Sequence, residues 1–156
     1  MKIHETAIVS KKAQLGTDIE IGPYSIIGDQ AIIGDGCVIQ SQVVIEGDVQ
    51  MGESNLIGHG ALIGGVPQFS GFKPETKSRV EIGRANAIRE YCTIHRGATE
   101  GSATVIGDEN LIMVGVHLGH DCQIGNGVVI TNNSLLAGYV RVDVRAVNAG
   151  GTRFHQ

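Results

Sequence analysis

Aliphatic side chains recur at every sixth position of this chain. The register begins at Ile3, holds to Ile63, and after an irregular stretch returns one residue displaced, from Ile82 to Val142. Its first run comprises Ile3, Val9, Leu15, Ile21, Ile27, Ile33, Ile39, Ile45, Met51, Ile57 and Ile63. Neither the 3.6-residue period of a helix nor the two-residue alternation of an ordinary strand produces this spacing. The pattern predicts a parallel β-helix built from hexapeptide repeats.

Each six-residue unit combines one aliphatic residue with small neighbours. A glycine often follows the aliphatic residue, as Gly22 follows Ile21, and a small residue usually stands two positions before it, as Cys37 stands before Ile39. We expect a short flat strand and then a corner, with three units closing a triangular coil of 18 residues. β-Branched residues suit the faces, and glycine suits corners that need unusual backbone angles. Residues 1–156 should form a single all-β domain.

Two segments leave the repeat and should be loops extruded from the coil. They are residues 64–79 and 96–105, which are rich in polar residues and glycine and lack aliphatic residues in register. Insertions in solenoids often gather on the binding face. Phe69 and Phe72 in the first loop offer apolar surface to a partner. Tolerated surface insertion is the alternative, and it is the stronger competitor for the second loop.

Composition excludes several classes of protein. Aromatic residues make up 4% of the chain and tryptophan is absent, so a core of large rings is excluded. Three cysteines with no paired spacing argue against a disulfide framework and for a reducing compartment. The N-terminus lacks an apolar leader, and no run is long enough to span a membrane. With a net charge of −4, we expect a cytoplasmic protein with no nucleic-acid partner and no stable membrane insertion.

The stretch HLGHDC, residues 117–122, concentrates side chains that can do chemistry. Adding one coil of 18 residues to His120 gives Gly138, so the two should stack at the strand spacing of about 4.8 Å. A neutral imidazole is a common general base near pH 7, and the neighbouring Asp121 could fix its tautomer. The Gly138 N–H could stabilise an oxyanion. This set would suit acyl transfer to a hydroxyl group.

Other interpretations of the same residues remain open. Asp121 could bond only a corner N–H, and Cys122 is in the small inward register, which favours a packed filler over a nucleophile. Zinc is the sharper rival for the histidines. However, His117 and His120 do not by themselves define a three-ligand site, and the remaining histidines are far apart in sequence. We expect no metal.

Four segments resemble one family closely: NAIREYCTIHRGATEG (86–101), NLIMVGVHLGHDCQIGN (110–126), NNSLLAGYV (132–140) and the terminal HQ. The resemblance is to the acyl-ACP:UDP-N-acetylglucosamine O-acyltransferases, which begin lipid A synthesis. It implies a left-handed β-helix and a homotrimer with active sites between subunits. It also implies transfer of a 3-hydroxyacyl chain from acyl carrier protein to the 3-hydroxyl of the UDP-amino sugar. No cofactor is implied beyond the acyl carrier protein as co-substrate.

The resemblance assigns roles to individual residues. His120 is similar to the general base, Asp121 to its partner and Gly138 to the oxyanion donor. The substrate-contacting positions correspond to Gln68, His117, His155 and Gln156.

The chain also departs from the family pattern. Phe69 stands where the family has an acid, Gly71 where it has a lysine, and Tyr139 where a histidine is common. Asn148 and Arg153 interrupt the last coil, which we expect to be loose.

Members of the family continue beyond the terminal HQ into a helical domain. Without it, we expect weak binding of carrier protein. The competing functions are a non-catalytic trimeric β-helix that binds ligand and a zinc hydratase of the hexapeptide type.

Overall fold

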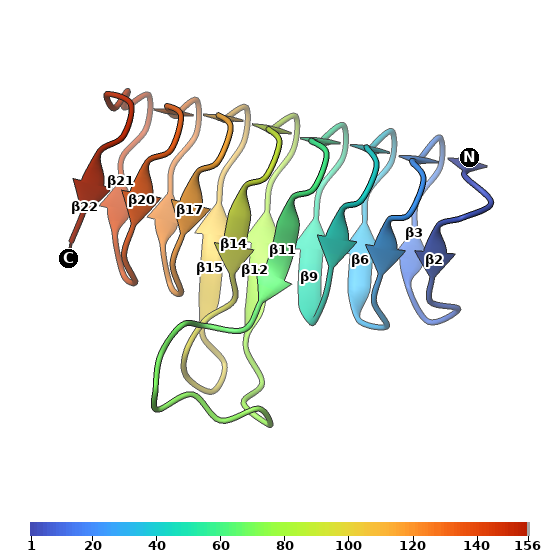
Figure 1. Cartoon of the computed structure of the whole chain (residues 1–156), viewed down its shortest axis with the longest axis horizontal. Helices are drawn as coiled ribbons and strands as arrows, with labels where there is room; N and C mark the ends of the chain where they lie inside the picture. Colours follow the sequence, from blue (N-terminus) through green and yellow to red (C-terminus); the bar gives the residue numbers. More distant parts are fainter. Residues whose placement is uncertain (156) are drawn as a thin grey trace.

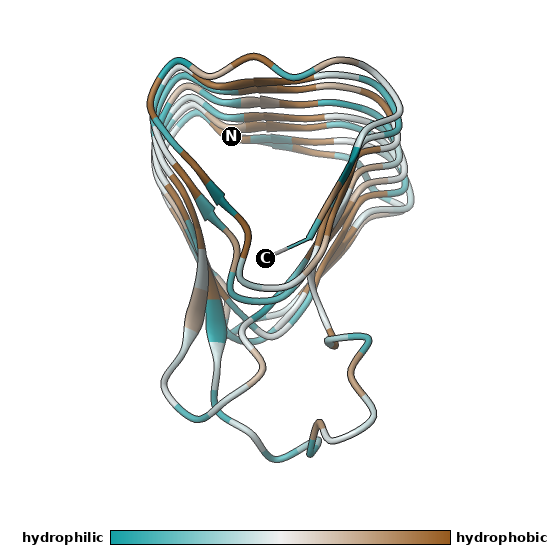
Figure 2. Cartoon of the chain, turned by 90° about the vertical axis from the view of Figure 1, so that its left-hand side faces the viewer, coloured by the Kyte–Doolittle hydropathy of each residue, from teal (hydrophilic) through white to brown (hydrophobic). Residues whose placement is uncertain are grey.

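The computed structural model describes residues 1–155 as a stack of triangular coils (Figure 1). Every named strand pairs in parallel with the strand one coil away, and the described residues contain no helix. The strands form three flat sheets, which we call A, B and C, and these enclose a central core (Figure 2). The six-residue period therefore forms the parallel β-helix that it predicts.

The strands follow one another around the coil in the order sheet A, sheet B, sheet C. Sheet A contains β1 (Lys2–Ile3), β4 (Glu20–Ile21), β7 (Val38–Ile39), β10 (Leu56–Ile57), β13 (Ala87–Ile88), β16 (Leu111–Ile112) and β19 (Val129–Ile130). Sheet B contains β2 (Ile8–Val9), β5 (Ile26–Ile27), β8 (Val44–Ile45), β11 (Leu62–Gly65), β14 (Thr93–His95), β17 (His117–Leu118), β20 (Leu135–Leu136) and β22 (Arg153–Phe154). Sheet C contains β3 (Gln14–Leu15), β6 (Ala31–Ile33), β9 (Asp48–Met51), β12 (Arg79–Ile82), β15 (Ala103–Ile106), β18 (Gln123–Ile124) and β21 (Arg141–Val142).

The two insertions leave the coil at the same corner, between sheets B and C (Figure 2). They are shorter than expected. β11 extends to Gly65 and β12 begins at Arg79, so the first loop spans residues 66–78. β15 begins at Ala103, so the second spans residues 96–102. The expected loop 96–105 was too long because β12 and β15 pair over four residues each, which draws residues 103–105 into sheet C.

Aliphatic residues of the six-residue register fill the interior. Ile45, Ile57 and Ile63 in the central coils are completely buried, whereas Ile3 in the first coil is 42% exposed. Burial of an aliphatic side chain stabilises a fold by about 1.5–3 kcal/mol. The coils between the two ends therefore hold most of the hydrophobic stabilisation.

Glycine after the aliphatic residue serves a different purpose from the one expected. Most of these glycines do not have a positive φ, and the strained corner angles are carried largely by other residues, such as Asp18 and Gln42. At Gly22, a Cβ would lie 2.8 Å from the backbone carbonyl carbon of Gln40 in the next coil. The expectation was wrong because the requirement is close approach between stacked backbones and not backbone freedom.

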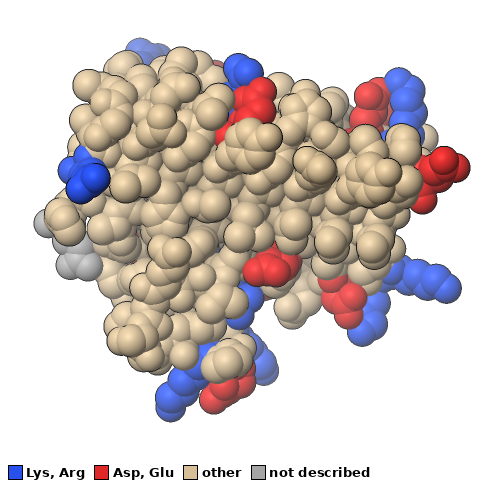
Figure 3. All heavy atoms as spheres, viewed as in Figure 1, with Lys and Arg blue, Asp and Glu red and all other residues tan. Residues whose placement is uncertain are grey.

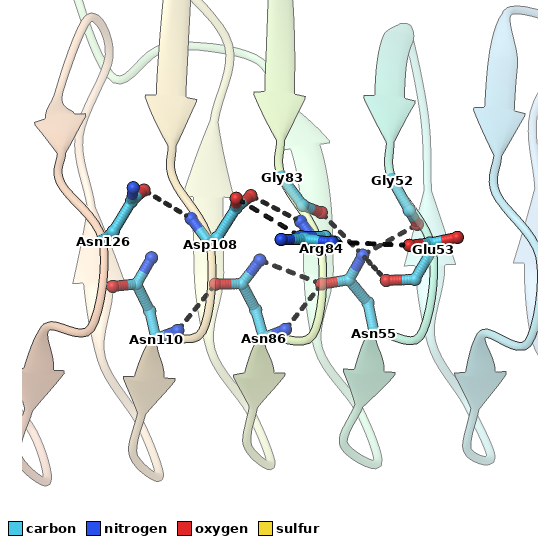
Figure 4. A network of polar contacts seen from close by, with 9 residues as sticks. All are labelled: Gly52, Glu53, Asn55, Gly83, Arg84, Asn86, Asp108, Asn110 and Asn126. Carbon is cyan, nitrogen blue, oxygen red and sulfur yellow. Dashed lines mark hydrogen bonds and ion pairs between the residues drawn. The ribbon is translucent and has the colours of Figure 1, made fainter.

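An internal ladder of asparagines supports the corner between sheets C and A (Figure 4). The Asn86 N–H and Nδ2 both donate to Asn55 Oδ1 at 2.9 Å, and Asn86 Oδ1 accepts the Asn110 N–H at 2.9 Å. All three side chains are buried. Outside the ladder, Arg84 lies between Glu53 and Asp108 at 3.9 and 3.6 Å. These exposed ion pairs contribute little, so the buried amides are the main polar support of this corner.

The last coil contains no unsatisfied amide at Asn148. Its Oδ1 accepts the Thr131 N–H at 2.7 Å, and its Nδ2 donates to Ser134 Oγ and Thr152 Oγ1 at 2.8 and 2.9 Å. Arg153 lies on the outer register of β22, opposite Leu135, and Phe154 takes the inner position. The expectation that Asn148 and Arg153 interrupt the coil was wrong, because one is hydrogen-bonded inside it and the other points outward.

The outer face of sheet B is nearly free of charge (Figure 3). Its outward side chains from β2 to β20 are Ile8, Ile26, Val44, Leu62, Thr93, His117 and Leu135. Sheet C is more polar, with outward Gln50, Glu81 and Gln123 on three of its strands. The charged side chains seen in Figure 3 lie mainly around the rim and on the loops. Sheet B therefore presents a flat apolar surface that includes His117.

Candidate active site at the corner of His120

His120 follows β17 and is paired with the next residue in the chain. Its Nδ1 lies 2.9 Å from Asp121 Oδ2, and its side chain is 18% exposed. A carboxylate can only accept, so the imidazole carries its proton on Nδ1 when neutral, and Nε2 keeps its lone pair. The pair is therefore set to accept a proton at Nε2.

Asp121 is held from the side opposite His120 by the second loop. The Ala98 N–H donates to Asp121 Oδ2 at 2.9 Å, and the Asp121 N–H donates to Thr104 Oγ1 at 2.8 Å. The Thr104 hydroxyl in turn donates to the His95 carbonyl at 2.6 Å. Asp121 thus binds both a backbone N–H and the imidazole, which were alternatives in the sequence. Loop 96–102 is more than a tolerated insertion, because it orients this carboxylate.

Gly138 lies against the imidazole, as the 18-residue register predicts. A Cβ on Gly138 would be 2.5 Å from His120 Nε2, so only glycine allows the ring to sit there. The neighbouring Tyr139 N–H donates to the His120 carbonyl at 2.9 Å. Within residues 1–155, the Gly138 N–H has no hydrogen-bond acceptor. A donor without a partner beside a base can bind a developing oxyanion.

A third histidine, His95, joins the site and was missed in the sequence. Its ring lies 4.8 Å from that of His117 in an edge-to-face contact, and the residue is 6% exposed. Burial, together with the nearby His117 and His120, lowers the pKa of His95 to about 4. The insertion hides this neighbour, since Ile94 pairs with Leu118 across a longer spacing than 18 residues. The segment TIHRG carried the signal once that offset is known.

His117 lies on the outer face of β17. Its Nδ1 is 2.8 Å from Thr93 Oγ1, and burial lowers the pKa of its imidazole. With His95, it forms a pair of neutral rings beside the base. A neutral imidazole recognises hydroxyl and amide groups by hydrogen bonding and carries no charge for a phosphate.

The other expected substrate positions lie at varying distances from the base. Gln68 is exposed on the first loop, next to Phe69, whose ring centroid is 6.0 Å from that of His120. His155 is exposed directly after β22, and the register of β20 with β22 stacks it above Ala137. Gln156 lies outside the described residues.

Cys122 is a packed filler. Its side chain is completely buried, and its thiol donates to the Ala137 carbonyl at 3.2 Å. Burial raises the pKa of Cys122 to about 11. A protonated, inaccessible thiol is a poor nucleophile, so the filler interpretation is confirmed.

The residues described in the structure do not gather three or more His, Cys, Asp or Glu side chains in a geometry that could hold a metal ion. The same part of the chain has no helix long and apolar enough to cross a membrane. No observation favours the zinc hypothesis.

Comparison with known proteins places this fold and site in a class. A profile described as bacterial transferase hexapeptide (six repeats) matches residues 30–65 and 103–138. The chain belongs to these hexapeptide-repeat proteins.

Particular relatives match over the whole chain. The acyl-(acyl-carrier-protein)–UDP-N-acetylglucosamine O-acyltransferase of Paraburkholderia xenovorans is 54% identical over 156 residues, which is 99% of this chain and 59% of the relative. The enzyme of the same name from Herminiimonas arsenicoxydans is 49% identical over 99% of this chain and 59% of its own length. The chain thus spans about three-fifths of the length of the curated relatives it matches.

Solved structures agree with this assignment. The UDP-N-acetylglucosamine acyltransferase of Francisella novicida superimposes with a TM-score of 0.96 at 37% identity, covering 99% of this chain and 56% of that one. The corresponding protein of Campylobacter jejuni gives a TM-score of 0.91 at 37% identity, covering 99% and 60%. The chain is a left-handed parallel β-helix of this type.

Proposed function

We propose that this chain carries the acyl-transfer site of a UDP-N-acetylglucosamine O-acyltransferase of lipid A synthesis. The donor is a 3-hydroxyacyl group on acyl carrier protein, and the acceptor is the 3-hydroxyl of the UDP-amino sugar. The observation that supports this most strongly is the His120–Asp121 pair seated against the unpaired N–H of Gly138. The names of the relatives supply the substrates.

In the proposed mechanism, His120 Nε2 takes the proton of the acceptor hydroxyl as its oxygen attacks the thioester carbonyl carbon. Asp121 stabilises the imidazolium, because its carboxylate accepts the Nδ1 proton. The carbonyl oxygen becomes an oxyanion that the Gly138 N–H stabilises. The C–S bond then breaks, and the imidazolium returns its proton to the leaving thiolate, which leaves a sugar ester and a free carrier-protein thiol.

Four further positions are proposed to contact substrate. His117 lies beside the base with a free Nε2, Gln68 is on the loop that reaches His120, and His155 follows the strand that covers β20. Gln156 is included on the family resemblance alone. No cofactor or metal takes part in this mechanism.

We further propose that the chain acts as a homotrimer. The apolar outer face of sheet B includes His117, and a triangular prism packs naturally around a threefold axis through such flat faces. Light scattering should give three times the chain mass, and a stable monomer would count against the trimer. A cytoplasmic location is proposed as well, supported by three free, buried cysteines.

The decisive experiment is a transfer assay with 3-hydroxyacyl carrier protein and UDP-N-acetylglucosamine. Formation of the acylated nucleotide sugar at a rate proportional to the amount of protein would support the proposal. Binding of the nucleotide sugar without any transfer would identify the chain as a non-catalytic binding β-helix instead. Metal analysis of the same preparation tests the zinc hydratase hypothesis, which requires stoichiometric zinc.

A further inference from the structure

Two aromatic side chains flank the proposed base. The Phe69 ring centroid lies 6.0 Å from that of His120 at an interplanar angle of 42°, and the Tyr139 centroid lies 5.0 Å away at 89°. Phe69 comes from loop 66–78, and Tyr139 comes from the corner one coil beyond His120. Each side chain is 50% exposed. Both rings therefore touch the base and still present half of their surface outward.

The contact with His120, and not the backbone conformation, distinguishes Tyr139. Its φ of 62° is unusual for a bulky residue. However, Tyr24 and Tyr91 adopt the same conformation, with φ values of 60° and 58°, and are each 65% exposed. Those two tyrosines lie at the corner between sheets A and B, away from the base. The chain thus contains its own matched controls for a corner tyrosine.

The groups beside these rings are suited to a neutral ligand. His95 and His117 are uncharged near neutral pH, because burial lowers the pKa of both. The carboxylate of Asp121 is already engaged by the Ala98 N–H and by His120. The surface around the base is therefore built of two aromatic rings and two neutral imidazoles. Such a surface matches a pyranose, which offers an apolar C–H face for the rings and hydroxyl groups for the imidazoles.

We infer that Phe69 and Tyr139 are specificity-determining residues that stack on the sugar ring of the acceptor. This inference rests on the proposed function and identifies how the site recognises its acceptor. The hydroxyl group that loses its proton must reach His120 Nε2, so the pyranose that carries it lies within reach of any ring that touches the imidazole. The acyl carbonyl, by contrast, is directed to the Gly138 N–H beneath the ring. Recognition by stacking replaces the polar contacts that an acid and a histidine would make at these two positions.

The test is a calorimetric titration of the intact chain with UDP-N-acetylglucosamine and, separately, with UDP. Tyr139→Asn keeps a residue that tolerates the left-handed conformation and removes the ring; Tyr91→Asn is its control. Phe69→Ser is paired with Val66→Ser, since Val66 is 51% exposed on the same loop. Loss of one stacking ring should raise the Kd for UDP-N-acetylglucosamine roughly fivefold. The Kd for UDP should stay unchanged in all variants, and the two controls should match wild type for both ligands.

Each alternative outcome is distinct. Equal losses for UDP and UDP-N-acetylglucosamine, or no loss in Tyr139→Asn and Phe69→Ser, would overturn the stacking role while leaving the proposed function intact. A normal Kd for the nucleotide sugar with a raised KM for the acyl donor alone would assign the rings to the acyl chain, and that too would overturn it. Failure of the wild-type chain to bind UDP-N-acetylglucosamine at all would refute the proposed function and this inference with it. Melting temperatures equal to wild type establish that the variants are folded.

Discussion

Replacing Gly138 with Ala tests how the base is seated. The added Cβ would lie 2.5 Å from His120 Nε2 and 2.9 Å from His120 Nδ1, closer than atoms in contact. Gly138 does not have a positive φ, so its backbone accepts alanine without strain. The imidazole, which is at the surface, must give way by about 1 Å to reach an ordinary contact distance. Such a shift opens the 2.9 Å contact with Asp121.

The expected loss is in chemistry and not in folding. A displacement of about 1 Å in a catalytic group costs roughly 10²-fold in rate, and we expect that loss in acyl transfer by Gly138→Ala. The free energy of unfolding should change by less than about 1 kcal/mol, because the ring can move outward without overpacking the core. Nitrogen NMR of the imidazole should show loss of the Nδ1–H tautomer. Gly150→Ala is the control, since its Cβ would meet no atom closer than 3.6 Å.

One result would refute this reasoning. If Gly138→Ala retained wild-type transfer and an intact Nδ1–H signal, the imidazole would not sit against Gly138, and the geometry on which the proposed mechanism depends would be wrong.

Three further predictions follow from buried groups. Asn86→Ala removes two ladder contacts and leaves the buried Asn110 N–H without its partner, so chemical denaturation should show a loss of about 2 kcal/mol; a loss below about 0.5 kcal/mol would contradict the ladder. His95 stays neutral in the folded chain down to about pH 4, whereas the unfolded chain binds a proton below about pH 6.5. Stability should therefore fall as the pH drops from about 6.5 to 4, by at most about 3 kcal/mol, and His95→Gln should flatten that dependence in denaturation curves; an unchanged slope would argue against a buried neutral His95. The Cys122 thiol should resist iodoacetamide at pH 8 until the chain unfolds, because burial raises its pKa to about 11; rapid alkylation of the native protein would revive a thiol mechanism.

The repeat made much of the fold and the centre of the site predictable. Because every coil away from the insertions has 18 residues, the offset from His120 to Gly138 placed two residues against each other without knowledge of the structure. The same regularity predicted the inward aliphatic register and the burial of Cys122. A constant period converts sequence distance directly into spatial distance, which ordinary globular folds do not allow.

Contacts that depend on the insertions were not predictable in this way. His95 stacks near His117 only because the second loop lengthens that coil, and the loop conformation also brings the Ala98 N–H to Asp121. The approach of Phe69 to His120 likewise depends on how loop 66–78 folds back. Loop geometry arises from many weak local contacts, and a repeat pattern contains no information about it.

Side-chain satisfaction was the other source of error. Asn148 looked like a defect because an amide stood in an aliphatic register, yet three neighbouring residues satisfy its hydrogen bonds. Hydrogen-bond partners of a buried amide lie on adjacent coils, and only coordinates show whether they point toward it.

The central claim is that His120 is the general base for acyl transfer, and the most direct measurement is kcat/KM of His120→Ala beside that of Cys122→Ala. The assay uses 3-hydroxyacyl carrier protein and UDP-N-acetylglucosamine, with light scattering to confirm that both variants keep the assembly state of the wild type. We predict that His120→Ala loses roughly 10²- to 10⁴-fold, the usual contribution of a general base, while Cys122→Ala stays close to wild type. Near-normal transfer by His120→Ala would contradict the account.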